Sequence, residues 1–226
     1  MERTPKPHDP TNRQGSASRL LPPRASELPP RAADPRPLRC CLLSGGASRR
    51  MGRDKALLPH PEGGTWLERS LGLLAQLELP ITLLTRHAAH LELAAALPQV
   101  TPIAEPAPWE GPLLALHRLM QRHPEQRLLL CPVDMPELHL AALRELLAAA
   151  AHKPQGIHLA HDGLRLQPLL GVYPSSIPLR QHLAASIDGG ERRLQSWLEA
   201  HPCTPVPLDP RALRNVNRPE RDQPSA

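Results

Sequence analysis

The chain has 226 residues, 40% hydrophobic and 22% charged, with a formal net charge of +5. This length suits one sizeable domain with a packed core. Three Trp, one Tyr and no Phe leave few aromatic rings to stack on bases, and the charge is weak, so a nucleic-acid-binding surface is not expected. No apolar run approaches the roughly 18 residues of a membrane span, so we expect no membrane partner.

Residues 1–38 are rich in Pro, Arg and Ser and show no apolar periodicity, which predicts a disordered tail. A transit or docking segment is one interpretation, although the prolines and acidic residues fit a transit peptide poorly. A dispensable tail is the other. We expect residues 39–220 to form one domain and residues 221–226 a flexible end.

The domain begins with an apolar strand, RCCLL at 39–43, which stops at the glycine turn Ser44-Gly45-Gly46. Two glycines let the backbone approach a ligand closely, and the N–H groups of a tight turn form an anion-binding concavity. Arginines and Lys55 follow directly, and cations neutralise phosphate oxygens. The spacing matches neither GxxxxGK[ST] nor GxGxxG. The segment predicts a polyphosphate site; an ordinary turn with a solvated basic face is the alternative.

The rest of the domain alternates short β patterns with helical ones. Strands are expected at 80–85, 100–104 and 127–131, and helices at 65–77, 88–97, 112–123 and 138–152. This alternation predicts an α/β fold with a mostly parallel, doubly wound sheet. Two β patterns, 156–160 and 167–173, then flank an Asp-Gly turn and predict an antiparallel excursion. Helices at 177–186 and 192–201 and a β run at 203–207 complete the chain.

A candidate metal ligand, Asp134, lies in CPVDMP just past the strand at 127–131. Open α/β sheets bind ligands at the carboxyl ends of their strands, and Mg²⁺ prefers a carboxylate combined with phosphate oxygens and water. An aspartate that forms a turn before Pro136 is the alternative. None of the twelve histidines has metal-site spacing, and we expect His87 and His90 to be solvated or capping groups.

The four cysteines form no CxxC pair. Cys40 and Cys41 should point to opposite faces of one strand, which argues against a zinc site. Buried thiols in a reducing cytoplasm are the expected state.

The stretch LSGGASRRMGRDK, residues 43–55, resembles the LAGGxSxRMGxDK signature of the nucleotidyltransferases that make molybdenum cofactor dinucleotides, in particular the molybdenum cofactor guanylyltransferases. The resemblance implies a three-layer, Rossmann-like nucleotidyltransferase fold with an antiparallel excursion in the C-terminal half. It also implies a nucleotide site in which the strand end meets the base and ribose, while the cations face the triphosphate. The residues assigned to this site are Leu43, Ser44, Gly45, Gly46, Arg50 and Lys55.

Other segments resemble the same family. Asp134 matches its magnesium ligand, and Glu105 stands where the family usually has an aspartate at the nucleotide site; a surface glutamate is the alternative. Segments similar to HDG, HP, GERR and NVN follow in the C-terminal half. The resemblance implies that Arg192, with Arg193, binds the acceptor's phosphate, a solvated pair at a helix start being the alternative. Asn215 and Asn217 would bind a pterin edge.

The expected function is transfer of GMP from GTP to the terminal phosphate of molybdopterin or Mo-molybdopterin, with Mg²⁺ and release of pyrophosphate, in the cytoplasm. Lys55, Asp134 and Arg50 are the expected catalytic residues. Transient contact with other proteins of molybdenum cofactor biosynthesis is also expected. Three alternatives stay open: a molybdopterin cytidylyltransferase, a sugar-phosphate nucleotidyltransferase, and a non-catalytic molybdopterin-binding partner protein.

Overall fold

The computed structural model describes residues 1, 36–45, 54–61 and 63–215. The helices and strands that it describes belong to one unit, Ala33–Ala226, whereas the other unit, Met1–Ala32, has only Met1 among the described residues. In the described part of the chain, seven strands form one sheet in the order β3-β2-β1-β4-β6-β5-β7. They are β1 (Leu38–Leu43), β2 (Ile81–Thr85), β3 (Val100–Ala104), β4 (Arg127–Pro132), β5 (Ile157–His161), β6 (Leu166–Pro174) and β7 (Cys203–Pro207).

Strand direction follows the predicted pattern. β1 pairs in parallel with β2 and β4, and β2 with β3. β6 runs antiparallel to both β4 and β5, whereas β7 is parallel to β5. The sheet is therefore mostly parallel with an antiparallel excursion in the C-terminal half, as expected. The chain runs outward from β1 through β2 to β3 and then returns to β1's other side for β4, which makes the gap between β1 and β4 a topological switch point.

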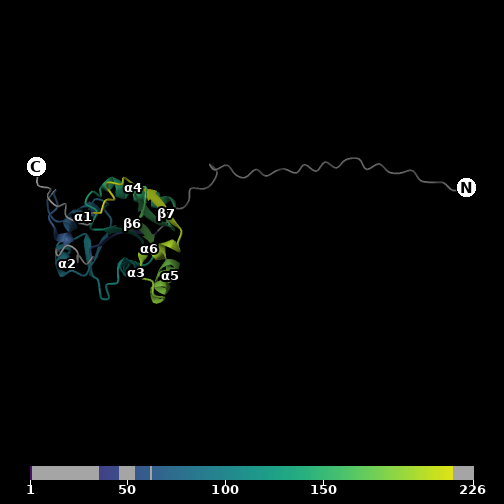
Figure 1. Cartoon of the computed structure of the whole chain (residues 1–226), viewed down its shortest axis with the longest axis horizontal. Coiled ribbons are helices and arrows are strands. Elements are labelled where there is room, and N and C mark those ends of the chain that lie inside the picture. The colour runs from purple at the N-terminus through teal and green to yellow at the C-terminus, as the bar shows by residue number, and fades with distance from the viewer. Residues whose placement is uncertain (2–35, 46–53, 62, 216–226) are drawn as a thin grey trace, which may run out of the picture. The chain divides into compact units, whose positions relative to one another are not determined.

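Helices cover both faces of the sheet (Figure 1). They are η2, a 3₁₀ turn (Lys55–Leu57), α1 (Trp66–Ala75), α2 (Ala88–Ala95), α3 (Pro112–Arg122), α4 (Leu140–His152), α5 (Ile177–Asp188) and α6 (Leu194–Glu199). Residues of α1, α2 and α4 pack in one core, and residues of α3, α5 and α6 in the other. No described helix has the length and apolar character needed to cross a membrane.

The central strand β1 feeds both cores. Cys40 belongs to the core under α1 and α4, and Cys41 to the core under α3, so the prediction that they point to opposite faces is confirmed. Both thiols are fully buried, and burial raises the pKa of Cys40 to about 12. A buried neutral thiol of this kind acts as a small apolar side chain, not as a metal ligand.

Helix ends agree with their local sequence. Thr65 caps α1 with a capping box, in which its hydroxyl accepts from the Glu68 backbone N–H and the Glu68 carboxylate accepts from the Thr65 N–H. The helix predicted over 192–201 is shorter, because Arg192 precedes it and Arg193 is its N-cap. Both arginines are exposed where α6 begins, which agrees with the alternative of a solvated pair at a helix start.

Candidate active site

The carboxyl ends of β1 and β4 lie side by side at the switch point. Leu43 is in register with Pro132, so the chain enters the glycine turn beside the turn that carries Asp134. Lys55 is the first residue of η2, and its Nζ lies 3.6 Å from Asp134 Oδ2. The same Nζ lies 5.8 Å from the centroid of the Trp66 ring. Two predicted site residues from distant segments are thus brought together at the edge where open α/β sheets bind ligands.

Asp134 suits a metal that is shared with substrate. Its side chain is 31% exposed, and that of Lys55 is 13% exposed. Among the described residues there is no group of three or more His, Cys, Asp or Glu that could hold a metal ion. A single carboxylate is compatible with Mg²⁺, which is commonly held by one or two carboxylates while substrate phosphates and water complete its coordination. The donor chemistry fits a divalent metal.

Glu105 is not a surface glutamate. It is buried directly after β3, and its Oε1 accepts a hydrogen bond from Arg118 Nη1 of α3 at 2.7 Å. The other carboxylate oxygen faces the glycine turn, since a Cβ placed on Gly45 would lie 2.8 Å from Glu105 Oε2. Glycine at position 45 therefore makes room for this carboxylate. Trp109, 52% exposed, donates its indole N–H to the Glu105 carbonyl and does not cover the core.

His90 occupies a position that the sequence did not reveal. Its side chain is fully buried, so the expectation of a solvated or capping histidine is wrong. Its Nδ1 lies 2.9 Å from Ser44 Oγ and its Nε2 lies 2.8 Å from Asp54 Oδ2. Burial lowers the pKa of His90, against the raising effect of Asp54. A sequence signal existed: His90 lies in the helix after the second strand, whose carboxyl end adjoins that of the first.

The Arg192 side chain already has two partners in the described structure. Its Nε lies 2.5 Å from Glu110 Oε2 in the loop before α3, and its Nη1 donates to the Ile187 carbonyl at 2.8 Å. The side chain is 44% exposed. The Glu191 carboxylate accepts from the backbone N–H groups of Arg192 and Arg193, and these bonds lower the pKa of Glu191. An incoming phosphate would compete with Glu110 for the guanidinium.

Asn215 is exposed at the end of the described chain. The preceding residue, Arg214, donates to Glu137 at 3.3 Å, and Leu213 is buried in the core that also contains Met135. These contacts hold the start of the Asn-Val-Asn segment near the β4–α4 connection that carries Asp134. Three predicted site residues lie outside the described residues: Gly46, Arg50 and Asn217.

The segment similar to HDG forms a self-contained turn. Asp162 Oδ1 accepts from the backbone N–H groups of Leu164 and Arg165, and its Oδ2 accepts from Gln167 Nε2 at 2.9 Å. These bonds lower the pKa of Asp162, chiefly through the N–H of Arg165. The hydrogen bond between Gln167 and Asp162 thus closes the β5–β6 hairpin.

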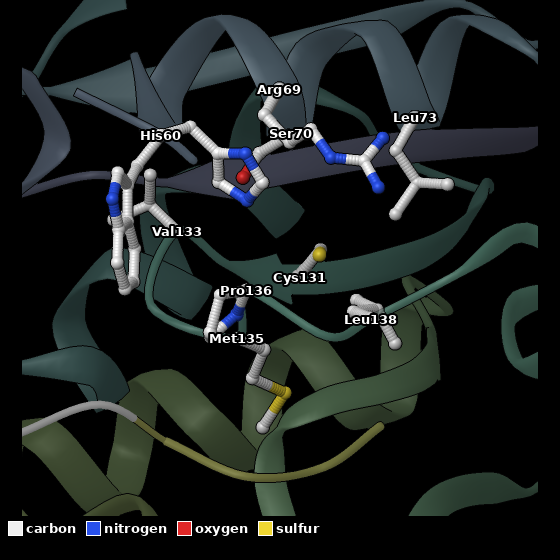
Figure 2. A pocket seen from close by; sticks show the side chains of 10 residues that line it. His60, Arg69, Ser70, Leu73, Cys131, Val133, Met135, Pro136 and Leu138 are labelled. Atoms are coloured by element: carbon white, nitrogen blue, oxygen red, sulfur yellow. The ribbon is translucent and has the colours of Figure 1, made fainter. Parts of the chain in front are cut away.

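Two hollows flank the site. Figure 2 shows the smaller one, with His60, Ser70 and Leu73 on one side and Cys131, Met135, Pro136 and Leu138 on the other. Its volume of about 10 Å³ is room for about one water molecule, so it is a packing gap. The larger, about 380 Å³, lies between β3 and α3 beside Arg118. Neither the glycine turn nor Asp134 lines it, so the groups suited to a polyphosphate lie outside it.

Known proteins resemble this chain over most of its length. The profile of the family described as "MobA-like NTP transferase domain" matches residues 40–204. A relative from Rhodopirellula baltica, described as a probable molybdenum cofactor guanylyltransferase, is 35% identical over 199 residues, which cover 84% of this chain and 92% of the relative.

Solved structures share the fold. Molybdopterin-guanine dinucleotide biosynthesis protein A from Archaeoglobus fulgidus is similar with a TM-score of 0.64 and 17% identity, over 80% of this chain and 93% of that chain. A Mycobacterium tuberculosis protein crystallised in complex with manganese is similar with a TM-score of 0.54 and 20% identity, over 76% of this chain and 89% of that chain. The predicted nucleotidyltransferase fold is confirmed. On the profile match and the identity to a guanylyltransferase, the chain belongs to the family of MobA-like NTP transferases.

Proposed function

We propose that this enzyme transfers GMP from GTP to the terminal phosphate of molybdopterin, or of its molybdenum-loaded form, and releases pyrophosphate. The product is the molybdopterin guanine dinucleotide. The observation that carries the proposal is the meeting of Lys55 Nζ and Asp134 Oδ2, 3.6 Å apart, at the switch point of the sheet. The 35% identity to a guanylyltransferase supports guanine as the base.

The reaction is an in-line substitution at the α-phosphorus of GTP. An oxygen of the acceptor phosphate forms a new bond to that phosphorus, while the bond to the bridging oxygen breaks and pyrophosphate leaves with the electron pair. Because the nucleophile is already an anion, no strong general base is needed. Catalysis then rests on positioning and on neutralising charge.

The described residues are suited to these two tasks. We assign Lys55 to the leaving pyrophosphate, whose negative charge grows as the bond breaks. Leu43, Ser44 and Gly45 hold the nucleotide at the end of β1, and Glu105 faces it across Gly45. The sequence adds Gly46 and Arg50 to the triphosphate side.

A divalent metal, which we propose is Mg²⁺, would be held by Asp134 and would supply charge neutralisation to the phosphate oxygens. The protein of the same fold that was crystallised with manganese is compatible with a divalent ion. No metal ligand beyond Asp134 is proposed.

For the acceptor, we assign Arg192 to its phosphate and Asn215 and Asn217 to the pterin edge, whose polar atoms suit an amide's paired donor and acceptor. Arg192 can exchange the Glu110 carboxylate for a phosphate, because a carboxylate and a phosphate are both oxyanions that accept hydrogen bonds from a guanidinium. We place the enzyme in the cytoplasm, since all four cysteines are free thiols. Contact with other proteins of cofactor biosynthesis stays a prediction.

The test measures molybdopterin binding and pyrophosphate release by the full chain with Mg²⁺, with molybdopterin or a sugar phosphate as acceptor and with GTP, CTP, ATP and UTP offered in parallel. Release with GTP alone is expected. Release with CTP instead would keep the chemistry and change the base, and release with a sugar phosphate but not with molybdopterin would change the acceptor. Molybdopterin binding without release from any nucleotide would favour the non-catalytic partner protein.

A further inference from the structure

A buried histidine joins the two segments that carry the proposed triphosphate ligands. Ser44 directly follows β1 and precedes Gly45, and Asp54 immediately precedes Lys55. His90 of α2 contacts both of them, Ser44 Oγ through Nδ1 at 2.9 Å and Asp54 Oδ2 through Nε2 at 2.8 Å. The two contacts use opposite edges of one imidazole ring, so the ring spans the distance between the segments.

The groups around His90 are consistent with a neutral ring of one tautomer, in which Nε2 approaches Asp54 Oδ2 closely but outside hydrogen-bond geometry. A carboxylate beside Nε2 favours the proton on that nitrogen, which leaves Nδ1 to accept from the Ser44 hydroxyl. The Thr85 hydroxyl donates to the Ser44 carbonyl at 3.2 Å and also lies 3.1 Å from His90 Nδ1. His87 lies on the same helix, with its ring centroid 4.8 Å from that of His90.

Asp54 links this histidine to the lysine. Its Oδ1 accepts from the Ala56 N–H at 3.1 Å and so caps η2, while Oδ2 lies against His90. Lys55 is the first residue of that turn, and its Nζ is directed to Asp134. Rotation of the Asp54 carboxylate would release both the cap and the start of η2, and would move Lys55.

We propose that His90 is a positioning residue for nucleotide binding: by holding Ser44 and Asp54 together, it sets the places of Gly45 and Lys55 relative to Asp134. This inference rests on the proposed function, since it assigns Gly45 and Lys55 to GTP. His90 does not touch the reacting atoms. Its removal therefore weakens nucleotide binding without removing a charge from the transition state.

The experiment measures the dissociation constant of GTP with Mg²⁺ for the full-length protein in the absence of acceptor, together with the thermal midpoint. His90→Ala is expected to raise the GTP dissociation constant between about 10- and 100-fold, because small displacements of binding groups have effects of this size. The KM for molybdopterin should stay within about twofold of wild type. His90→Gln, which retains an N–H for Asp54, should lose less than His90→Ala, and it also serves if His90→Ala does not fold.

His123 provides a matched control. It is also buried and also bound to a residue of β2, with its Nε2 3.0 Å from Thr82 Oγ1, but it contacts neither Ser44 nor Asp54. His123→Ala should lower the thermal midpoint and leave GTP binding unchanged. Asp54→Asn should add little to the effect of His90→Ala on GTP binding, because both remove the same contact.

The outcomes separate the two proposals. If wild type binds GTP and the His90 variants bind it equally well, or lose no more affinity than His123→Ala, the inference is overturned and the proposed function stands. If wild type binds no GTP, the proposed function fails and the inference fails with it. A selective loss in the His90 variants, partly restored by glutamine, supports both.

Discussion

Lys55 and Asp134 meet without forming a tight pair. Their separation of 3.6 Å exceeds the length of a hydrogen bond, so the two side chains attract each other by charge without a hydrogen bond that fixes their geometry. Each group can therefore turn toward a phosphate oxygen or a metal at small cost. Opposite charges held this close suit a site where both act on one polyphosphate.

Asp134→Asn removes the proposed metal ligand while keeping the side chain's size. We expect turnover to fall at least about a hundredfold, since one charged transition-state contact contributes about 3 kcal/mol, with the thermal midpoint nearly unchanged. Lys55→Ala should show a similar loss and weaker GTP binding. Steady-state pyrophosphate release and a thermal melt measure both. Wild-type rates in both variants would exclude the assigned mechanism.

Gly45→Ala tests the close approach of Glu105. The new Cβ would meet Glu105 Oε2 at 2.8 Å, and the hydrogen bond from Arg118 to Oε1 keeps that carboxylate from moving aside. We expect weaker GTP binding and a loss of about 1–3 kcal/mol in stability. The double variant Gly45→Ala with Glu105→Asp shortens the side chain and should recover much of the stability. No recovery would show that the clash is not with Glu105.

The residues of the site differ in how well the sequence revealed them. Lys55 belongs to an ordered motif, and Asp134 follows a buried strand. Both lie at the carboxyl ends of strands, where the sequence predicted the site. His90 has no motif spacing, and its role depends on α2 packing against the ends of two strands. Such a contact joins residues far apart in sequence, and residue type alone does not specify it.

At the scale of elements, local sequence predicted most of the fold. The bounds expected for β3 and β7 coincide with those observed. The helix α3 begins at Pro112 as expected, because proline fits the first turn of a helix. Gly111 before it has a φ of +101°, which glycine adopts readily. The β5–β6 hairpin was predicted from its Asp-Gly turn. Its register shift between Leu159 and Ala160 was not, because a bulge depends on the facing strand.

Two glycines give a paired test of this packing. At Gly171 of β6, a Cβ would lie 2.6 Å from the His158 carbonyl oxygen and 2.6 Å from Leu159 Cδ2, so backbone must move. Gly171→Ala should lower the free energy of unfolding by about 1–3 kcal/mol. Gly72, in α1, has no heavy atom within 4 Å of the added Cβ, and Gly72→Ala should raise stability by about 1 kcal/mol.

Chemical denaturation of the two variants beside wild type measures both effects. A Gly171→Ala variant as stable as wild type would mean that β5 shifts without cost. A destabilised Gly72→Ala variant would contradict the open surroundings of that helix face.

At the scale of the whole molecule, the sequence predicted a mostly parallel, doubly wound sheet but not the order of its strands. β7 follows β6 in the chain but does not pair with it, and instead pairs in parallel with β5 at the edge of the sheet. Strand order depends on which apolar faces meet across long connections, and a pattern of alternating strands and helices is compatible with several orders. The resemblance to a known family supplied the overall class that local patterns alone left broad.

The buried histidines make stability depend on pH. Burial lowers the pKa of His123 to about 4, with help from Arg39 and Arg122, and burial also lowers the pKa of His90 and of His158. In the unfolded chain each returns to about 6.5, so the unfolded state binds more protons between the two values. Stability is then complete above pH 6.5 and is lost as the pH falls toward 4.

For His123 alone the shift corresponds to about 3 kcal/mol. Urea unfolding between pH 7 and pH 4 should show this decline, and His123→Gln, which does not titrate, should flatten part of it while starting from a lower stability at pH 7. The exposed carboxylates whose pKa values are lowered, Asp162 and Glu191, act in the same direction but only at lower pH. A free energy of unfolding that stays constant from pH 7 to pH 4 in wild type would mean that these histidines are protonated as readily in the folded protein as in the unfolded chain.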